Sequence, residues 1–138
     1  MSKTLARLLT ITDVSFLAYW TASLLIQFHL FSVPAEWMYA GYRDPRVSAW
    51  NWSFLPLDLL FSAFGLAAVA ASRAGRTIWR PLALVSLILT MVAGLMAVGY
   101  WILLGEFDPG WFLPNLALVF WPVWFARNLI IQLGSSDP

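Results

Sequence analysis

The stretch from Pro81 to Leu104 reads PLALVSLILTMVAGLMAVGYWILL and contains no charged residue. A helix needs about 20 apolar residues, at a rise of ~1.5 Å per residue, to cross the ~30 Å hydrocarbon core of a bilayer. This stretch exceeds that length and so predicts a transmembrane helix. The whole chain is 61% hydrophobic and only 11% charged, whereas a soluble domain carries roughly 25% charged residues. We therefore expect an integral membrane protein.

Three further stretches have the same apolar character. The pattern predicts an all-α, four-helix transmembrane bundle that forms a single integral membrane domain over residues 1–138. Its spans are expected over residues 5–31, 52–72, 81–104 and 111–133. The first apolar stretch is too long for a signal peptide and is interpreted as a retained span. A long outer loop, from Ser32 to Asn51, contains prolines and a glycine and joins the first two spans.

The basic residues predict the orientation of the bundle. Lysine and arginine are enriched in the cytoplasmic loops of membrane proteins. Four spans would place six of the eight basic residues on one side of the membrane: Lys3, Arg7, Arg73, Arg76, Arg80 and Arg127. We therefore expect both termini in the cytoplasm, an N-in/C-in topology.

The sequence lacks the residues that several classes of function require. The chain has no cysteine and one histidine, which argues against thiolate and imidazole metal sites. A net charge of +1 without a basic patch argues against nucleic acid as a partner. The sequence contains no nucleophile–base–acid set and no glycine-rich phosphate loop. We therefore expect no metal and no cofactor, and an enzyme is the less favoured reading.

Asp58 is the residue that most invites a functional interpretation. An acid at the centre of a spanning helix costs roughly 2.5–3.5 kcal/mol on insertion scales, so it needs a partner or a purpose. Phe54, Ser62 and Gly65 share its helical face, which predicts that Asp58 points into the bundle. A ligand site in the outer half of the membrane would combine Asp58 with the polar and aromatic groups of similar depth: Gln27, His29, Trp52, Tyr100, Trp101 and Asn115. A structural hydrogen-bond cluster that sets the helix register is the alternative.

Asp13 lies in the inner half of the first span, where Arg127 at the inner end of the fourth span is within plausible reach. A structural ion pair between these two residues is the favoured interpretation. In the third span, the small residues Ser86, Thr90, Gly94 and Ala97 form one stripe, which is more typical of close helix packing than of chemistry.

The run AWNWSFLPLDL, from Ala49 to Leu59, resembles the YvaD-like family of bacterial membrane proteins. The similarity extends to Ile11-Thr12-Asp13 and Tyr19-Trp20, so it covers roughly the first half of the chain. The resemblance implies a multi-pass protein of the bacterial inner (plasma) membrane. It implies no activity, because the family has no established function.

The layout is also similar to the EXPERA group, which includes the sigma-2 receptor and the emopamil-binding protein. The likeness rests on four helices, the Arg43-Asp44-Pro45 run in the outer loop, Trp79-Arg80-Pro81 before the third span, and the inward acid of the second span. It implies that Asp58 faces a lipophilic, sterol-sized ligand. The third span has no acid, and Phe54 stands where the isomerase of this group has a histidine, so the resemblance favours binding over isomerisation.

Three functions follow as hypotheses. The first is a membrane-embedded binder of a sterol-like, isoprenoid or cationic amphiphilic molecule around Asp58, with aromatic walls that supply apolar area and cation–π contact. The second is a lipid isomerase-type enzyme that uses Asp58 and His29 as proton shuttles. The third is an accessory or small multidrug-transport subunit. The expected partners are membrane lipid and a lipophilic small molecule, and a homo-oligomer stays open.

Overall fold

The computed structural model describes residues 1–39 and 41–135, and over these residues it contains helices and no strand. The elements are α1 (Lys3–Gln27), the 3₁₀-helix η1 (Ala35–Trp37), α2 (Pro45–Trp52), α3 (Leu55–Arg73), α4 (Trp79–Leu104) and α5 (Pro109–Gly134). Four segments are long and apolar enough to cross a membrane: α1, the continuous stretch Pro45–Arg73 that joins α2 to α3, α4 and α5. The prediction of an all-α fold with four apolar helices is confirmed.

The second span begins earlier than predicted. The expected loop reached Asn51, but helix α2 already begins at Pro45. Asp44 caps this helix, since its Oδ1 accepts a hydrogen bond of 2.7 Å from the backbone N–H of Arg46, and a proline is favoured at the first helical position. The Asp-Pro pair is therefore a helix start signal, and its proline is not a loop residue as predicted.

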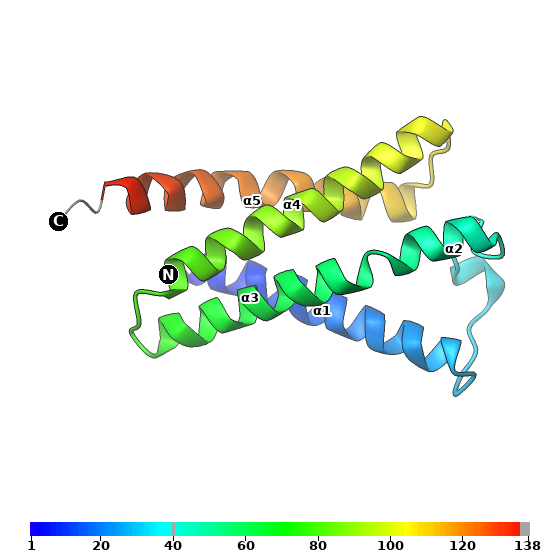
Figure 1. The fold of residues 1–138 in the computed structure, drawn as a ribbon, viewed down its shortest axis with the longest axis horizontal. Helices are drawn as coiled ribbons and strands as arrows, with labels where there is room; N and C mark the ends of the chain where they lie inside the picture. The colour runs from blue at the N-terminus through cyan, green and yellow to red at the C-terminus, as the bar shows by residue number, and fades with distance from the viewer. Residues whose placement is uncertain (40, 136–138) are drawn as a thin grey trace.

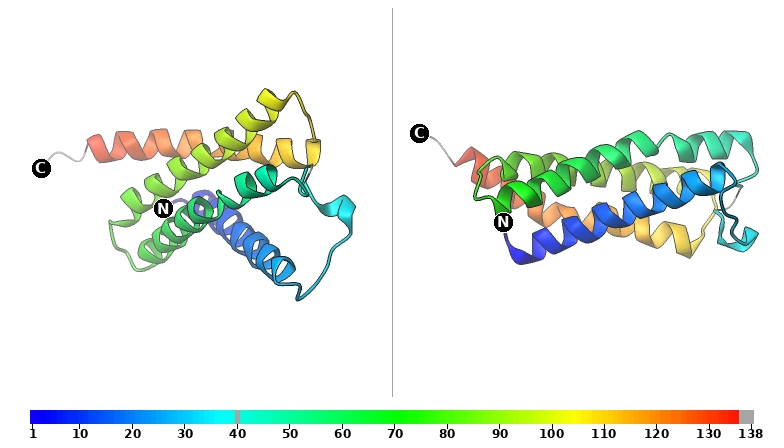
Figure 2. Two further views of the ribbon diagram at one scale, coloured as in Figure 1. Left: turned by 45° about the vertical axis from the view of Figure 1, so that its right-hand side comes forward. Right: turned by 90° about the horizontal axis from the view of Figure 1, so that it is seen from below.

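The helices pack in the order α1, α3, α4, α5, because the adjacent pairs of this series make the main interhelical contacts. Figure 1 shows the beginning of α1 and the end of α5 at the same end of the bundle, which we call the terminal end. Toward the opposite end, which we call the cavity end, α1 and α5 diverge (Figure 1 and Figure 2, left). Helices α3 and α4 thus form the centre of the bundle, and α1 and α5 flank them.

The two ends differ in how they are filled. At the terminal end, all four spans contribute to one core of buried side chains: Leu5, Leu9, Ala68, Val69, Ala83, Leu87, Ala126 and Leu129. Toward the cavity end, a second buried cluster comes from α1, from α3 with the residue that precedes it, and from α4: Trp20, Phe54, Phe61, Ala93 and Ala97. Among the described residues, α5 adds no buried side chain to that second cluster. The terminal end is therefore closed by packing, whereas α5 stands apart at the cavity end.

The small-residue stripe of α4 faces the interior, as predicted. Ser86 and Thr90 are almost completely buried. A Cβ atom on Gly94 would lie 2.7 Å from the backbone carbonyl oxygen of Asn115 in α5, so only glycine permits this close approach of α4 and α5.

Candidate functional site

Asp58 lies at the beginning of α3 and is 3% exposed. Its Oδ2 atom accepts a hydrogen bond of 2.9 Å from the indole Nε1–H of Trp20, which is also buried. Its Oδ1 atom is buried and has no hydrogen-bond partner among the described residues. The inward orientation predicted from the helical face is confirmed. An unpaired buried acceptor costs about 1–3 kcal/mol, so this oxygen is a candidate contact atom for a ligand.

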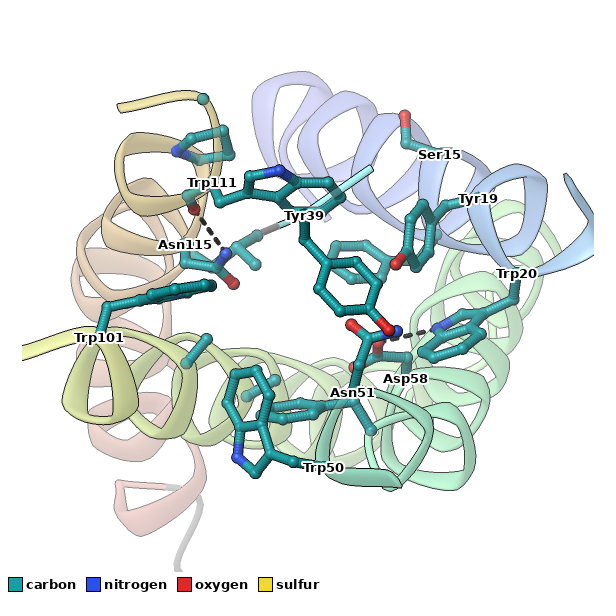
Figure 3. Close-up of a pocket in the computed structure, with 17 residues that line it drawn as sticks. Ser15, Tyr19, Trp20, Tyr39, Trp50, Asn51, Asp58, Trp101, Trp111 and Asn115 are labelled. Carbon is teal, nitrogen blue, oxygen red and sulfur yellow. Dashed lines mark hydrogen bonds between the residues drawn. The ribbon is translucent and has the colours of Figure 1, made fainter. Parts of the chain in front are cut away.

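A cavity of about 280 Å³ borders Asp58. Figure 3 shows Asp58 and Trp20 on one side of it and Trp111, Asn115 and Trp101 on the other. Its lining comes from all four spans and from the segment before α2: Ser15, Phe16, Tyr19, Trp20, Tyr39, Trp50, Asn51, Phe54, Asp58, Ala93, Ala97, Trp101, Gly110, Trp111, Pro114, Asn115 and Leu118. The wall is largely aromatic and carries few polar groups, which is the usual composition of a small-molecule site.

Asn115 contributes the polar group of α5. Its Nδ2–H donates a hydrogen bond of 2.7 Å to the backbone carbonyl of Trp111, one turn earlier. This bond fixes the side chain on the cavity side of α5, across from Asp58 (Figure 3). The amide oxygen remains as an acceptor, so the cavity offers acceptors on two opposite walls.

The structure divides the predicted site residues into three groups. Asp58, Trp101 and Asn115 line the Asp58 cavity. Gln27, His29 and Trp52 line a neighbouring second cavity of about 620 Å³, at the cavity end of α1. Tyr100 lines neither of these two cavities; its ring stacks on Trp50 with centroids 3.7 Å apart.

The prediction of one common pocket therefore needs correction. Depth in the membrane was the criterion that joined these residues, but depth does not determine on which side of a helix a residue lies. Gln27 and His29 stand at and beyond the end of α1, where this helix has diverged from α5 (Figure 2). Tyr100 precedes the buried Trp101 and is turned about 100° from it around α4.

Sequence reasoning missed several lining residues, above all Tyr19, Tyr39, Asn51 and Trp111, which line both cavities. A signal existed for Trp111, since it precedes Asn115 by four residues and so shares its helical face. Tyr39 had no such signal, because it lies outside the spanning helices.

The predicted ion pair between Asp13 and Arg127 is wrong. Asp13 is completely buried, and neither of its carboxyl oxygens has a hydrogen-bond partner among the described residues. Arg127 is exposed on α5. Asp13 instead packs against Gly65 of α3: a Cβ atom there would lie 2.8 Å from the Asp13 carboxyl carbon and 2.8 Å from Ser86 Oγ. The reason is the helix order, since α1 makes its main contacts with α3, and α1 with α5 is not among the main packing pairs.

The described residues include no group of three or more histidine, cysteine, aspartate or glutamate side chains that could hold a metal ion. The arrangement around Asp58 is thus a hydrophobic cavity with a buried hydrogen-bond acceptor.

Comparison with known proteins identifies the family of the chain. Residues 5–136 match the model of a family of unknown function, DUF5360. The chain is similar to the uncharacterised protein YvaD of Bacillus subtilis (strain 168), with 38% identity over 120 residues, which cover 87% of this chain and 86% of the relative. No solved structure matches the chain. The YvaD-like resemblance is confirmed, whereas the likeness to the EXPERA group stays a prediction. This four-helix, multi-pass membrane bundle belongs to the DUF5360 family.

Proposed function

We propose that the protein binds a lipophilic ligand in the Asp58 cavity, with a cationic or hydrogen-bond-donating group of the ligand at Asp58 Oδ1. The observation that carries the proposal is this buried, unpartnered oxygen in the wall of an aromatic cavity. A donor on the ligand would satisfy it, and binding would recover the free energy that the apo protein loses by burying it.

The charge and composition of the cavity support a donor or a cation as the ligand's polar group. Among the described residues that line it, Asp58 is the only formally charged one. The Tyr19, Tyr39 and Trp111 rings are available to an alkyl chain or to the periphery of a cation. An anionic group would meet a carboxyl group without a basic partner and is therefore disfavoured.

The test compares dodecylamine with the neutral dodecanol, each added to the protein in lipid nanodiscs. Asp58→Asn keeps the size of the side chain and an acceptor for Trp20. We expect dodecylamine to raise the melting temperature of the wild type and to lose most of this effect in Asp58→Asn. Glu106→Gln is the matched control, because Glu106 is an exposed acid at the same end of the bundle. An equal shift in the wild type and in Asp58→Asn contradicts the proposal.

The other hypotheses gain no specific support. A lipid isomerase would need Asp58 and His29 near one substrate, but these residues line different cavities. No feature of the described residues favours an accessory or multidrug-transport subunit.

We also propose that the protein lies in the inner membrane with its terminal end facing the cytoplasm. Five of the six basic residues that lead to this orientation lie within about one helical turn of a helix end on that side: Lys3, Arg7, Arg73, Arg76 and Arg80. The sixth, Arg127, lies in the terminal half of α5, which ends at Gly134. Because the chain has no cysteine, single substitutions Ser2→Cys and Glu106→Cys can report the orientation. In spheroplasts, a membrane-impermeant maleimide should label Glu106→Cys and not Ser2→Cys; the opposite pattern would reverse the orientation.

A further inference from the structure

We infer that the ligand enters the Asp58 cavity laterally from the bilayer, through an opening between α1 and α5. The ligand class is then a membrane-resident amphiphile with a single chain, whose donor group lies at Asp58 and whose chain extends into the lipid. The inference rests on the proposed function and deepens it, because it identifies where the ligand comes from and which part of it stays outside.

The route from the terminal end is closed. Phe61 follows Asp58 by about one turn of α3, on the side of the terminal end, and is completely buried. Beyond it, side chains from all four spans form the core that contains Leu9 and Leu87, both completely buried. A ligand from that side would have to separate four packed helices.

The route from the loops is covered by aromatic rings. Tyr39, from the segment between η1 and α2, is 7% exposed. Its ring lies edge to face with Trp111, with centroids 6.0 Å apart, and Figure 3 shows it between Trp111 and Asp58. Tyr39, Tyr19, Asn51 and Trp111 line both cavities, so they separate the Asp58 cavity from the more polar second cavity.

The exposed lining residues mark the opening. Three of the residues that line the Asp58 cavity are exposed: Ser15 on α1, and Gly110 and Pro114 on α5. The other lining residues are buried or half-buried. Helices α1 and α5 are also the flanking pair that is not among the main packing contacts of the bundle. The cavity therefore reaches the surface between two membrane-spanning helices, where the surrounding medium is lipid.

This geometry determines how a chain would be accommodated. A fully enclosed site of about 280 Å³ would reject a chain that exceeds its volume, because overpacking an interior is costly. A site that opens to the bilayer lets the excess methylene groups remain in lipid, where they are already solvated. Tolerance of long chains is thus the property that separates the two cases.

The experiment uses hexylamine and octadecylamine in nanodiscs, with the apparent Kd expressed as the mole fraction of amine in the lipid. We expect the wild type to bind octadecylamine at least as tightly as hexylamine. The opening is then blocked after folding: the Ser15→Cys protein is modified with benzyl methanethiosulfonate. The modification should weaken octadecylamine binding by at least about tenfold, a change of about 1.4 kcal/mol, and hexylamine binding by less.

The matched control is Val14→Cys with the same reagent, because Val14 is exposed on α1 and lines neither cavity. Binding to modified Ser15→Cys is compared with binding to the same variant before modification, which separates a blocked opening from a misfolded protein.

The outcomes also separate the two proposals. If octadecylamine binds much more weakly than hexylamine to the wild type, or if modified Ser15→Cys and Val14→Cys bind octadecylamine equally, the lateral opening is wrong. If Asp58→Asn loses binding of both amines in the same assay, the site itself still stands. If Asp58→Asn binds both amines as the wild type does, the proposed function is wrong as well.

Discussion

Asp13 and Asp58 are both buried acids of spanning helices, but they lie in opposite kinds of surroundings. Asp13 is packed against Gly65, which Ser86 of α4 also approaches, at a point where α1 lies close against α3. Asp58 accepts a hydrogen bond from Trp20 at one carboxyl oxygen, and its other oxygen borders a cavity. The comparison shows that burial of an acid at membrane depth does not by itself indicate a site. The free volume next to the carboxyl group distinguishes the two residues.

A hydrogen bond between α3 and α1 also lies between the two acids. Ser62 follows Asp58 by one helical turn, and its hydroxyl donates to the backbone carbonyl of Asp13 over 3.4 Å. Because Ser62 is completely buried, this contact joins α3 to α1 between the two carboxyl groups. It places the packed acid and the cavity acid on the same helix interface.

The largest expected effect is on the packed acid. Gly65→Leu would drive a side chain into Asp13 and Ser86, where even a Cβ atom has no room, so we expect a cost at or above the upper end of the usual range for overpacking, about 3 kcal/mol. We expect a lower melting temperature in nanodiscs and separation of α1 from α3. Ala67→Leu, on the exposed face of the same helix, is the control and should leave the melting temperature nearly unchanged. Equal melting temperatures of the two variants would contradict the packing role of Asp13.

A smaller effect is expected at the cavity acid. Trp20→Phe keeps an aromatic ring but removes the donor to Asp58 Oδ2, which leaves both carboxyl oxygens without a partner at a cost of about 1–3 kcal/mol. Reduced thermal stability, with recovery by dodecylamine, would support the ligand-facing interpretation of Asp58. Trp124→Phe, at a 63% exposed position of α5, should behave as the wild type. A Trp20→Phe protein as stable as the Trp124→Phe protein would show that this hydrogen bond contributes nothing.

The smallest effect is expected at Arg127. Since this arginine is exposed and Asp13 lies against α3, Arg127→Gln should change the free energy of unfolding by less than about 0.5 kcal/mol. A double-mutant cycle with Asp13→Asn is the decisive measurement. A coupling energy well above this value would restore the ion pair that the structure contradicts.

The helical period of the sequence predicted one part of the site, the orientation of Asp58. The inward orientation of Asp58 followed from the small and buried positions one and two turns away, Ser62 and Gly65. Trp101 and Asn115 were selected by their depth in the membrane, and both line the cavity. His29 and Gln27 were misplaced because residues of equal depth were treated as neighbours, although helices that diverge separate residues of equal depth.

The amino-acid sequence by itself determined the class of the fold and the approximate positions of the spans. In a bilayer, every backbone polar group needs an internal partner, so a long apolar stretch such as residues 81–104 has the helix as its main solution. Only the tertiary structure decided which helices are neighbours. Helix association in lipid depends on close packing of small residues such as Gly65 and Gly94 and not on hydrophobicity, so α1 joined α3, α5 joined α4, and a cavity remained beside Asp58.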